Sequence, residues 1–580
     1  MVERKGSGIK TKYMVCFIVL WLLQMAAAFW FCAQKQGFHE DEFYTYYSTA
    51  RTNGFYVEDG KWMERDEYRN EFVVLPGERF QYGLIKQVQS WDVHPPMYYW
   101  VFHTVASLVP GVFSKWIGLS VNLFFHGINL ILLTYLTYLT AGKRQPIPLF
   151  VMFVYGCSPA AMSGVVFIRM YEMLTAFVLL SAILHVRIVI RGEESGRGEG
   201  GLTDAGGGTR HSVGTLLFMA AVTYVGFLTQ YYYFIFLFFL AIAFCVWLLR
   251  RDRNIWNCLR YGLFQGLAFV LAYLTYPAFP GQMFKGQRGA QATENFFDLS
   301  NTLERIFFFW DLMNRYVFGG LLGLLLLLAA AAVVRLLSGK RRHGGAAQKK
   351  NVQGGQLAGK GVLAGAPFDM LLFTAAGYFL AVSKTALLLG DTSNRYQLPI
   401  YGIVVLLLFL GMDLLMRRLL SDGRYVKRAV GAAAVFCVAL VALGYVRADV
   451  VFLYPEAKEE TALAGSQAAA HVPAVYIYKP GEEWCIWAVA DELMKHDKVY
   501  FVSAASEEPI TEPEIAAADA VVAYIPLYDD AKSGAAQNGR IPSGNGKLSE
   551  GRLQHSHKFC ETWYYSGGGD TRSGTGDLTE

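Results

Sequence analysis

Three consecutive carboxylates follow the first apolar stretch of this chain. They lie in Phe38-His39-Glu40-Asp41-Glu42, and an aromatic run comes directly after them. A carboxylate in such a place can act as a general base on an acceptor hydroxyl or amine, provided that its neighbours hold its geometry and its pKa. A solvated charge cluster at a helix end explains the same residues without any chemistry. The pattern makes Asp41 and Glu42 candidates for acid–base catalysis.

A histidine beside two prolines is the second candidate. His94 precedes Pro95 and Pro96 at the end of the same polar stretch, just before an aromatic run. Two prolines fix a turn, and an imidazole N–H beside that turn can contact an anionic group. A structural turn next to an interfacial aromatic belt is the alternative explanation.

The elements around these residues follow from composition. The 580 residues are 54% hydrophobic and 15% aromatic but only 17% charged, whereas an ordinary soluble domain has about 25% charged residues. This excludes a string of soluble domains and a disordered or fibrous chain. The net charge of +5 is too small to indicate nucleic acid as a partner. Most of the chain is therefore expected to lie in lipid.

A membrane span needs about 20 mostly apolar residues, and the sequence predicts about eleven of them. The expected spans are 14–33, 116–140, 146–164, 172–190, 213–229, 231–250, 258–277, 317–336, 368–389, 398–416 and 428–446. The segment 97–113 is apolar but short, and it closes on Val109-Pro110-Gly111. If it crossed the membrane, every later loop would change sides, so we expect a re-entrant or interfacial helix there.

Basic residues sort to alternate connections between these spans, which gives the orientation. Short cytoplasmic loops carry an excess of Lys and Arg. The basic connections hold Arg4, Lys5, Lys10 and Lys12, Lys143 and Arg144, Arg187, Arg191 and Arg197, Arg250, Arg251 and Arg253, Arg335, Lys340, Arg341 and Arg342, and Arg417, Arg418, Arg424, Lys427 and Arg428. The N-terminus is then cytoplasmic, while loop 34–96 and the C-terminal tail lie outside.

Apolar density falls after residue 446. Short strand-like and helix-like stretches alternate between 447 and 535, which predicts a small extracytoplasmic α/β domain. Residues 536–580, rich in Gly, Ser, Asp and Lys, are expected to be a loosely ordered tail. Of the eight cysteines, only Cys485 and Cys560 lie in this soluble part. A disulfide between them is open, and no Cys/His spacing indicates a zinc or redox site.

Two basic side chains stand inside or between the expected spans. Lys384 falls within the run 368–389, and Arg169 separates two other spans at their outer ends. A lysine within the membrane is a functional candidate by default, and a lipid phosphate is its natural partner. For Arg169, snorkelling to the interface is the alternative to a substrate contact.

Three short motifs follow one another on the predicted outer side: Asp41-Glu42 after the first span, His94-Pro95-Pro96 before the next apolar segment, and Arg169-Met170-Tyr171 after Ser158-Pro159. Together they resemble membrane glycosyltransferases of the GT-C fold over about residues 1–400. The closest likeness is to family 39 and family 83, the protein O-mannosyltransferase and aminoarabinose transferase groups and their bacterial relatives. The expected fold is thus a polytopic α-helical GT-C-like domain of about 11–13 transmembrane helices over residues 1–446.

The resemblance implies a role for each matched residue. Asp41 takes the place of the catalytic base, with Glu42 as its neighbour. His94 stands where the aminoarabinose enzymes have a lysine that contacts the lipid phosphate. Tyr171 occupies the position of a second acidic residue in the next outer loop, and Glu172 is displaced from it by one place.

Two later motifs fit the same family. Thr229-Gln230-Tyr231 lies where relatives often carry Thr-His-Tyr, so that Gln230 replaces the histidine. Arg395-Tyr396, followed by Pro399, resembles the Arg-Tyr-x-x-x-Pro signature of these relatives. Gln230, Arg395 and Tyr396 are therefore expected to contact substrate.

The implied function is transfer of a sugar from a polyprenyl-phosphate donor to an acceptor at the outer face of a bacterial cytoplasmic membrane. The reaction would invert the sugar, with Asp41 as base and with His94, Lys384 and Arg395 stabilising the leaving phosphate. The sequence has no P-loop and no Rossmann fingerprint, consistent with a donor assembled elsewhere. No cofactor is certain. A divalent cation is compatible with the clustered carboxylates, although they form no convincing ligand set.

Two other classes of protein stay open. A transporter or flippase for a lipid-linked sugar would use the intramembrane charges as a pathway, but the chain lacks the internal repeat that many transporters show. A non-enzymatic envelope-assembly or sensor protein would use the soluble tail to bind a wall polymer. The acceptor is equally open among lipid, polysaccharide, teichoic-type polymer and protein.

Overall fold

The computed structural model describes residues 11–50, 56–142, 146–195, 212–342, 365–419, 423–506, 508–527, 551–557 and 559–566. The chain divides into two compact units. The membrane unit comprises Met1–Ala33, Lys86–Phe102 and Lys115–Phe452, and the sheet unit comprises Gln34–Ile85, His103–Ser114 and Leu453–Glu580. Among the residues used above for orientation, those in 1–10, 143–145 and 196–211 lie outside the described ranges.

Long apolar helices build the membrane unit. Within the described residues, eight helices are long and apolar enough to cross a membrane, and two bent helix pairs raise this to ten. The eight are α1 (Thr11–Gln34), α6 (Lys115–Ala141), α9 (Tyr171–Ser195), α11 (Tyr232–Asp252), α12 (Ile255–Thr275), α17 (Ala366–Thr385), α18 (Leu398–Leu419) and α19 (Gly423–Arg447). The shorter apolar helix α10 (Val213–Thr229) coincides with the remaining expected span.

The two bent pairs break where the sequence supplies a cap. Helix α7 (Pro146–Gly156) meets α8 (Pro159–Val166) at 58°, where the Ser158 side chain accepts a hydrogen bond from the Ala161 amide. Helices α15 (Thr302–Phe318) and α16 (Leu322–Arg342) form the other pair, bent by 90°. Gly319 ends α15 in the left-handed conformation, φ 55°. The expected span 317–336 is therefore α16 preceded by this bend.

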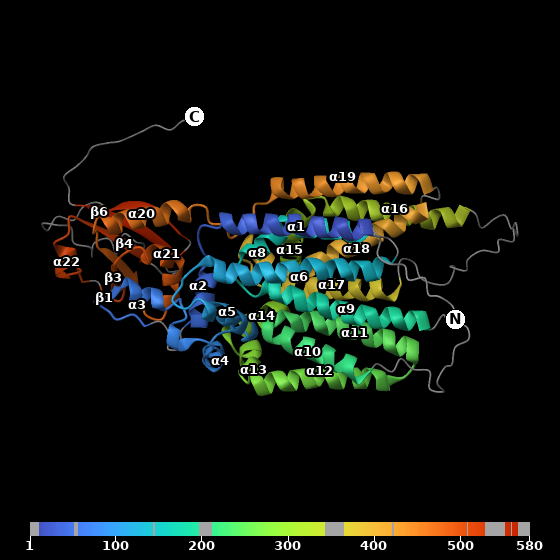
Figure 1. The fold of residues 1–580 in the computed structure, drawn as a ribbon, viewed down its shortest axis with the longest axis horizontal. Coiled ribbons are helices and arrows are strands. Elements are labelled where there is room, and N and C mark those ends of the chain that lie inside the picture. The colour runs from blue at the N-terminus through green and yellow to red at the C-terminus, as the bar shows by residue number, and fades with distance from the viewer. Residues whose placement is uncertain are drawn as a thin grey trace, which may run out of the picture. The chain divides into compact units, whose positions relative to one another are not determined.

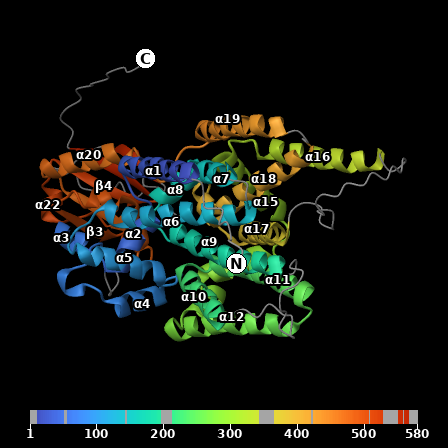
Figure 2. The ribbon, with the colours of Figure 1, turned by 45° about the vertical axis from the view of Figure 1, so that its right-hand side comes forward.

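Neighbouring helices of the membrane unit run side by side, as Figures 1 and 2 show for α6 with α9 and for α11 with α17. Helix α10 packs against α12, and α18 packs against α7 and α9. Large apolar side chains stay exposed on the outer helices, for example Leu263 and Leu274 of α12. Such faces suit contact with lipid, in which a helix satisfies its own backbone groups.

The segment expected to be interfacial forms helix α5 (Met97–Leu108), which has 12 residues. At 1.5 Å per residue this helix is about 18 Å long, too short for a hydrocarbon core of about 30 Å. The prediction of a non-spanning segment agrees with this length.

A six-stranded sheet forms the core of the sheet unit, with strand order β1-β3-β2-β4-β6-β5. The strands are β1 (Lys61–Glu64), β2 (Ala474–Tyr478), β3 (Lys498–Ser503), β4 (Ala520–Pro526), β5 (Arg552–Ser556) and β6 (Cys560–Ser566). The three central strands are parallel, and every residue of β2 is buried. Central parallel strands are buried on both faces, which explains their unbroken apolar runs.

Short helices connect and cover the strands of this sheet. They are α20 (Ala457–Ala469), η3 (Glu483–Val489), α21 (Ala490–Leu493) and α22 (Pro513–Ala516). The polytopic helical fold and the C-terminal α/β domain are thus confirmed.

Two boundaries differ from the expected ones. Strand β1 comes from loop 34–96, which was assigned to the membrane domain, and it pairs with β3 of the C-terminal domain. The same loop supplies α2 (Glu40–Ala50), α3 (Arg65–Asn70), η1 (Pro76–Glu78) and α4 (Tyr82–Trp91). Strands β5 and β6 fall within 536–580, where a loosely ordered tail was expected, and β6 pairs with β4. Backbone pairing between distant segments leaves no local pattern, so composition alone could not find it.

The pairing of β1 with β3 predicts a specific cross-link. Glu64 and Lys498 are partners in the register, and they form a pair without direct hydrogen bonds, in which side chains approach most closely. We expect Glu64→Cys combined with Lys498→Cys to form a disulfide under mild oxidation, detected by mass spectrometry of proteolytic fragments. Glu64→Cys with Tyr500→Cys, two residues out of register, is the control. Equal cross-linking of both pairs would contradict this register.

Candidate functional site

Helix α2 begins with the acidic motif, and His39 caps it. The Asp41 amide donates to His39 Nδ1 at 3.1 Å, and the His39 amide donates to the Glu42 carboxylate at 2.7 Å. These reciprocal bonds satisfy amide groups that have no partner within the helix. His39 Nδ1 also lies 3.3 Å from a Glu40 carboxylate oxygen and 3.7 Å from one of Asp41, so the histidine and the three carboxylates form one cluster at the start of α2.

The two adjacent carboxylates differ sharply in exposure. Glu42 forms an ion pair with Lys35 at 2.9 Å, and both side chains are fully buried. The Asp41 side chain is 35% exposed. Successive helix positions point about 100° apart, so one side chain enters the core while the next reaches solvent. Asp41 is accessible to a substrate, whereas Glu42 fixes the start of α2.

In the membrane unit, His94 and Arg169 belong to one polar cluster. His94 Nδ1 lies 3.2 Å from an Asp92 carboxylate oxygen. Arg169 Nη2 lies 3.2 Å from His94 Nε2, and Arg169 Nη1 donates to the Tyr99 hydroxyl at 3.1 Å. Arg169 is buried. The structure therefore joins two predicted residues and adds Asp92 and Tyr99, which sequence reasoning did not single out.

The neighbours of Asp92 favour the ionised form of its carboxyl group. Burial alone would raise the pKa of Asp92, but the neighbouring His94, the Val93 amide and Arg169 lower it below its ordinary value. Arg169 Nη2 also lies 3.4 Å from His94 Nδ1, so Asp92, His94 and Arg169 form one chain of polar contacts. His94 stands between the carboxylate and the guanidinium in this chain, and its role toward a lipid phosphate stays a prediction.

Side chains from the following helices hold the turn that carries His94. In helix α13 (Phe279–Phe284), Gln282 Nε2 donates to the carbonyls of Gln89 and Asp92 at 2.8 and 2.6 Å. The Tyr231 hydroxyl donates to Gln282 Oε1 at 2.5 Å. Gln230 is buried and accepts from the Tyr231 amide at 2.6 Å. The Thr-Gln-Tyr motif therefore reaches this turn through Tyr231, while Gln230 orders its own backbone.

Arg395 and Tyr396 lie in the short helix η2 (Thr392–Tyr396), directly before α18. The Arg395 guanidinium stacks over the rings of Phe167 and Tyr396, with 5.2 and 5.1 Å to their centroids, and donates to the Tyr396 hydroxyl at 3.2 Å. The ring of Tyr171 lies edge-on to that of Tyr396. Aromatic faces attract a cation electrostatically, so these rings hold the guanidinium in one orientation.

A pocket opens beside this guanidinium. Its lining combines polar side chains with apolar and aromatic ones, namely Ala160, Ser163, Gly164, Phe167, Tyr171, Asn394, Arg395, Leu398 and Phe452. The turn between α8 and α9 contributes Phe167 to it, the first residue of α9 contributes Tyr171, and the same turn carries Arg169. One short connection thus builds both basic clusters of the membrane unit.

Glu172 and Lys384 both form hydrogen bonds with other residues of the membrane unit. Glu172 is fully buried and accepts from Asn129 Nδ2 at 2.7 Å, with His126 Nδ1 at 3.5 Å. Lys384 donates to the Asp298 carbonyl, to Asn301 Oδ1 at 3.1 Å and to Thr302 Oγ1 at 3.0 Å. An ammonium has three donors, and these oxygens use all of them. In this structure Lys384 holds loop 298–302, and its role toward a lipid phosphate stays a prediction.

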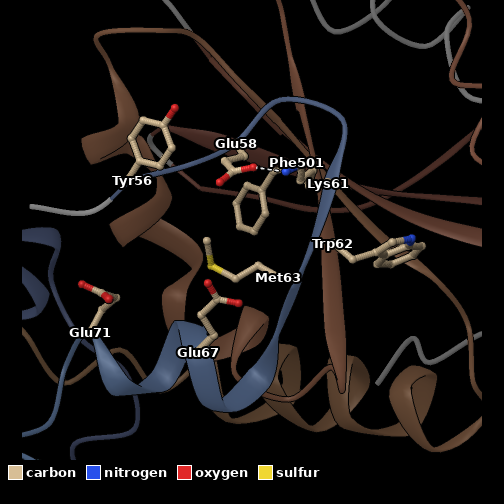
Figure 3. Close-up of a pocket in the computed structure, with 8 residues that line it drawn as sticks. All are labelled: Tyr56, Glu58, Lys61, Trp62, Met63, Glu67, Glu71 and Phe501. Atoms are coloured by element: carbon tan, nitrogen blue, oxygen red, sulfur yellow. Dashed lines mark ion pairs between the residues drawn. The ribbon is translucent and has the colours of Figure 1, made fainter.

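A second pocket lies in the sheet unit beside β1 (Figure 3). It is lined by Tyr56, Glu58, Lys61, Trp62, Met63, Glu67, Glu71 and Phe501. Glu58 pairs with Lys61, and the side chains of Met63 and Phe501 lie between Glu58 and Glu67. Carboxylates beside aromatic rings can accept hydrogen bonds from a hydroxyl-rich or cationic group. Elsewhere in this unit, Cys485 and Cys560 are both buried free thiols, and the disulfide left open above is not formed.

The buried pair of Glu42 and Lys35 predicts a large loss of stability when one partner is removed. Glu42→Gln leaves an uncompensated buried ammonium, which typically costs about 3–5 kcal/mol. We expect a clear drop in the thermal unfolding midpoint of the detergent-purified protein. The control is Glu58→Gln, whose pair with Lys61 is exposed and should contribute at most about 1 kcal/mol. Equal effects of the two variants would contradict a buried structural pair.

Comparisons with known proteins found relatives only among solved structures, since no family model and no curated protein matches the chain. ArnT from Cupriavidus metallidurans bound to undecaprenyl phosphate is 11% identical, with 96% of this chain and 98% of that chain covered and a TM-score of 0.49. AglB, an archaeal oligosaccharyltransferase from Archaeoglobus fulgidus in complex with an inhibitory peptide and a dolichol-phosphate, is 10% identical, with 96% and 74% covered and a TM-score of 0.41. Both are GT-C fold membrane glycosyltransferases, the group that the sequence resembles. At these identities and TM-scores, function has to be argued from this chain's own residues.

Proposed function

We propose that the protein is a glycosyltransferase that moves a sugar from a polyprenyl-phosphate donor to an acceptor at the outer face of a bacterial cytoplasmic membrane. The N-terminus would be cytoplasmic and the sheet unit extracytoplasmic, as the distribution of Lys and Arg favours. The acceptor would be an envelope lipid, polysaccharide or protein.

The observation that carries this proposal is the Arg395 pocket of the membrane unit. A guanidinium offers a planar fork of donors that matches phosphate oxygens, and it is less strongly hydrated than an ammonium. Arg395 is buried against aromatic rings beside a pocket whose other walls include Leu398, Ala160 and Phe452. A phosphate attached to an isoprenoid chain needs an anion-binding group next to apolar walls, and both occur side by side here. The pocket has a volume of about 10 Å³, room for about one water molecule, so its walls would have to move apart to admit the lipid phosphate.

Arg169 would provide a second positive charge for the donor phosphate. Asp92 and His94 hold its guanidinium in place, so little reorganisation is needed when negative charge develops on the leaving group. Tyr171 lines the Arg395 pocket and the ring of Tyr396 packs against Arg395, so both would orient the phosphate through their hydroxyls. Glu172, Gln230 and Lys384 would act as positioning residues, because each is buried and bonded within the protein.

The chemical step would be a single displacement. The acceptor oxygen or nitrogen attacks the anomeric carbon and loses its proton to Asp41. The bond between that carbon and the phosphate oxygen breaks, and its electron pair leaves with the phosphate, where Arg395 and Arg169 stabilise the charge. Attack opposite to the leaving group inverts the anomeric centre. Asp41 suits the role of base because its side chain reaches solvent while Glu42 is sealed in the core.

Replacement of the base tests the enzymatic proposal. We expect Asp41→Asn to lower transfer of labelled sugar from a synthetic polyprenyl-phosphate donor to membrane extract by about 10²–10⁴-fold, the usual contribution of a general base. Purified variants are compared at equal thermal stability, and Glu40→Gln, one residue earlier in the same helix, is the control. Transfer by Asp41→Asn at the wild-type rate would remove Asp41 from the mechanism. If no protein transfers from any donor of a panel while lipid still binds, the transporter or assembly class is favoured.

Replacement of the guanidinium tests the donor site. Arg395→Lys keeps the charge but loses the fork of donors, so we expect the affinity for polyprenyl phosphate to fall by about tenfold or more. Binding is followed by the fluorescence of a labelled lipid phosphate in detergent. Arg417→Lys, at an exposed ion pair with Asp413, is the matched control. An unchanged affinity of the Arg395 variant would place the phosphate elsewhere.

A further inference from the structure

We propose that the sheet unit binds one zinc-class transition-metal ion through Glu460, Glu492, His555 and His557, in a site that is independent of the glycosyltransferase chemistry. These residues come from helix α20, helix α21, strand β5 and the turn that follows β5. One ligand atom of each lies within 4.8 Å of all the others. The group combines two imidazoles with two carboxylates.

The distances match the edges of a small coordination polyhedron. His555 Nε2 and His557 Nε2 each lie 2.9 Å from an oxygen of Glu492, and His557 Nε2 lies 3.7 Å from Glu460 Oε2. In a tetrahedral site with bonds of 2.0–2.1 Å, neighbouring ligand atoms are about 3.3 Å apart. These three spacings bracket this value and the remaining ones stay within 4.8 Å, so an ion can enter when the side chains draw together around it.

The geometry of the hairpin explains how both histidines reach the same place. The β5–β6 register shifts between Leu553 and His555, and such a bulge re-aims the side chains that follow it. The His557 amide donates to the Cys560 carbonyl at 2.7 Å, which fixes the turn after β5. The rings of His555 and His557 lie 5.1 Å apart between centroids.

Charge and burial favour a cation at this position. Glu492 is 1% exposed, and Glu460 and the two histidines are half-buried. Asp491 adds a third carboxyl group close to the cluster. Bringing several carboxylates together away from water is costly unless they are compensated, and a dication compensates two of them at once.

The donor set selects the class of metal. Two imidazole nitrogens with two carboxylate oxygens suit zinc and its neighbours among the transition metals, whereas calcium and magnesium prefer oxygen alone. Four protein ligands leave no open position, which is typical of a structural site. The ion would hold the edge hairpin against α20 and α21. The sequence offered only His555-x-His557 as a signal, since Glu460 and Glu492 lie far upstream.

Metal content and stability of the full-length protein test this proposal. The protein is purified with an affinity tag free of histidine, stripped with chelator, reloaded with zinc chloride and desalted. We expect about one zinc per chain by mass spectrometry of the metal and a rise of about 5 °C or more in the unfolding midpoint, reversed by chelator. His555→Ala with His557→Ala should lose both effects, while His471→Ala, an exposed histidine of the same unit, should keep both.

A second measurement covers the case in which the double variant does not fold. Wild-type protein reloaded with cobalt(II) should show the intense visible absorption of a tetrahedral site, and added zinc should abolish it. Absence of this absorption, a zinc content near zero after reloading, or unchanged zinc binding in the double variant would overturn the proposal. The four side chains would then form a hydrogen-bonded cluster among themselves.

Discussion

Hydrocarbon cannot hydrogen-bond the backbone, and the architecture of the membrane unit depends on this constraint. Each span must be a helix, and a helix can break only where capping groups satisfy the freed amides and carbonyls. The breaks at Ser158 and Gly319 follow this rule. The chain also leaves helical geometry between α8 and α9, and this connection places Arg169 in one cluster and Phe167 in another.

Burial separates reactive from structural charges in this protein. Glu42 bonds to Lys35 and Lys384 bonds to loop 298–302, while one carboxylate oxygen of the buried Glu172 accepts from Asn129. A charge removed from water persists only when its partners compensate the lost hydration. Asp41 keeps contact with solvent, and Arg395 faces a pocket. Those two residues retain the capacity to meet a substrate, and the proposed mechanism is built on them.

The sheet unit shows how distant segments complete one another. Its first strand comes from the loop after α1, and its edge hairpin comes from the C-terminal region. Edge strands need protection against unwanted pairing. In this unit β1 is very short, and β5 carries a bulge next to its histidines. A metal ion at the β5–β6 hairpin would stabilise that edge of the sheet without requiring a larger core.

The sequence by itself determined the membrane helices, because hydropathy over about 20 residues is a local property that lipid enforces. It also identified Asp41, Arg169 and Arg395 as polar groups next to those helices. Tertiary structure decided which of Asp41 and Glu42 is buried, that Asp92, His94 and Arg169 meet in one cluster, and that β1 pairs with β3. It also decided that His555 and His557 meet Glu460 and Glu492. Each of these depends on contacts between residues far apart in the chain, and the free energy of such contacts is set by packing that no local pattern records.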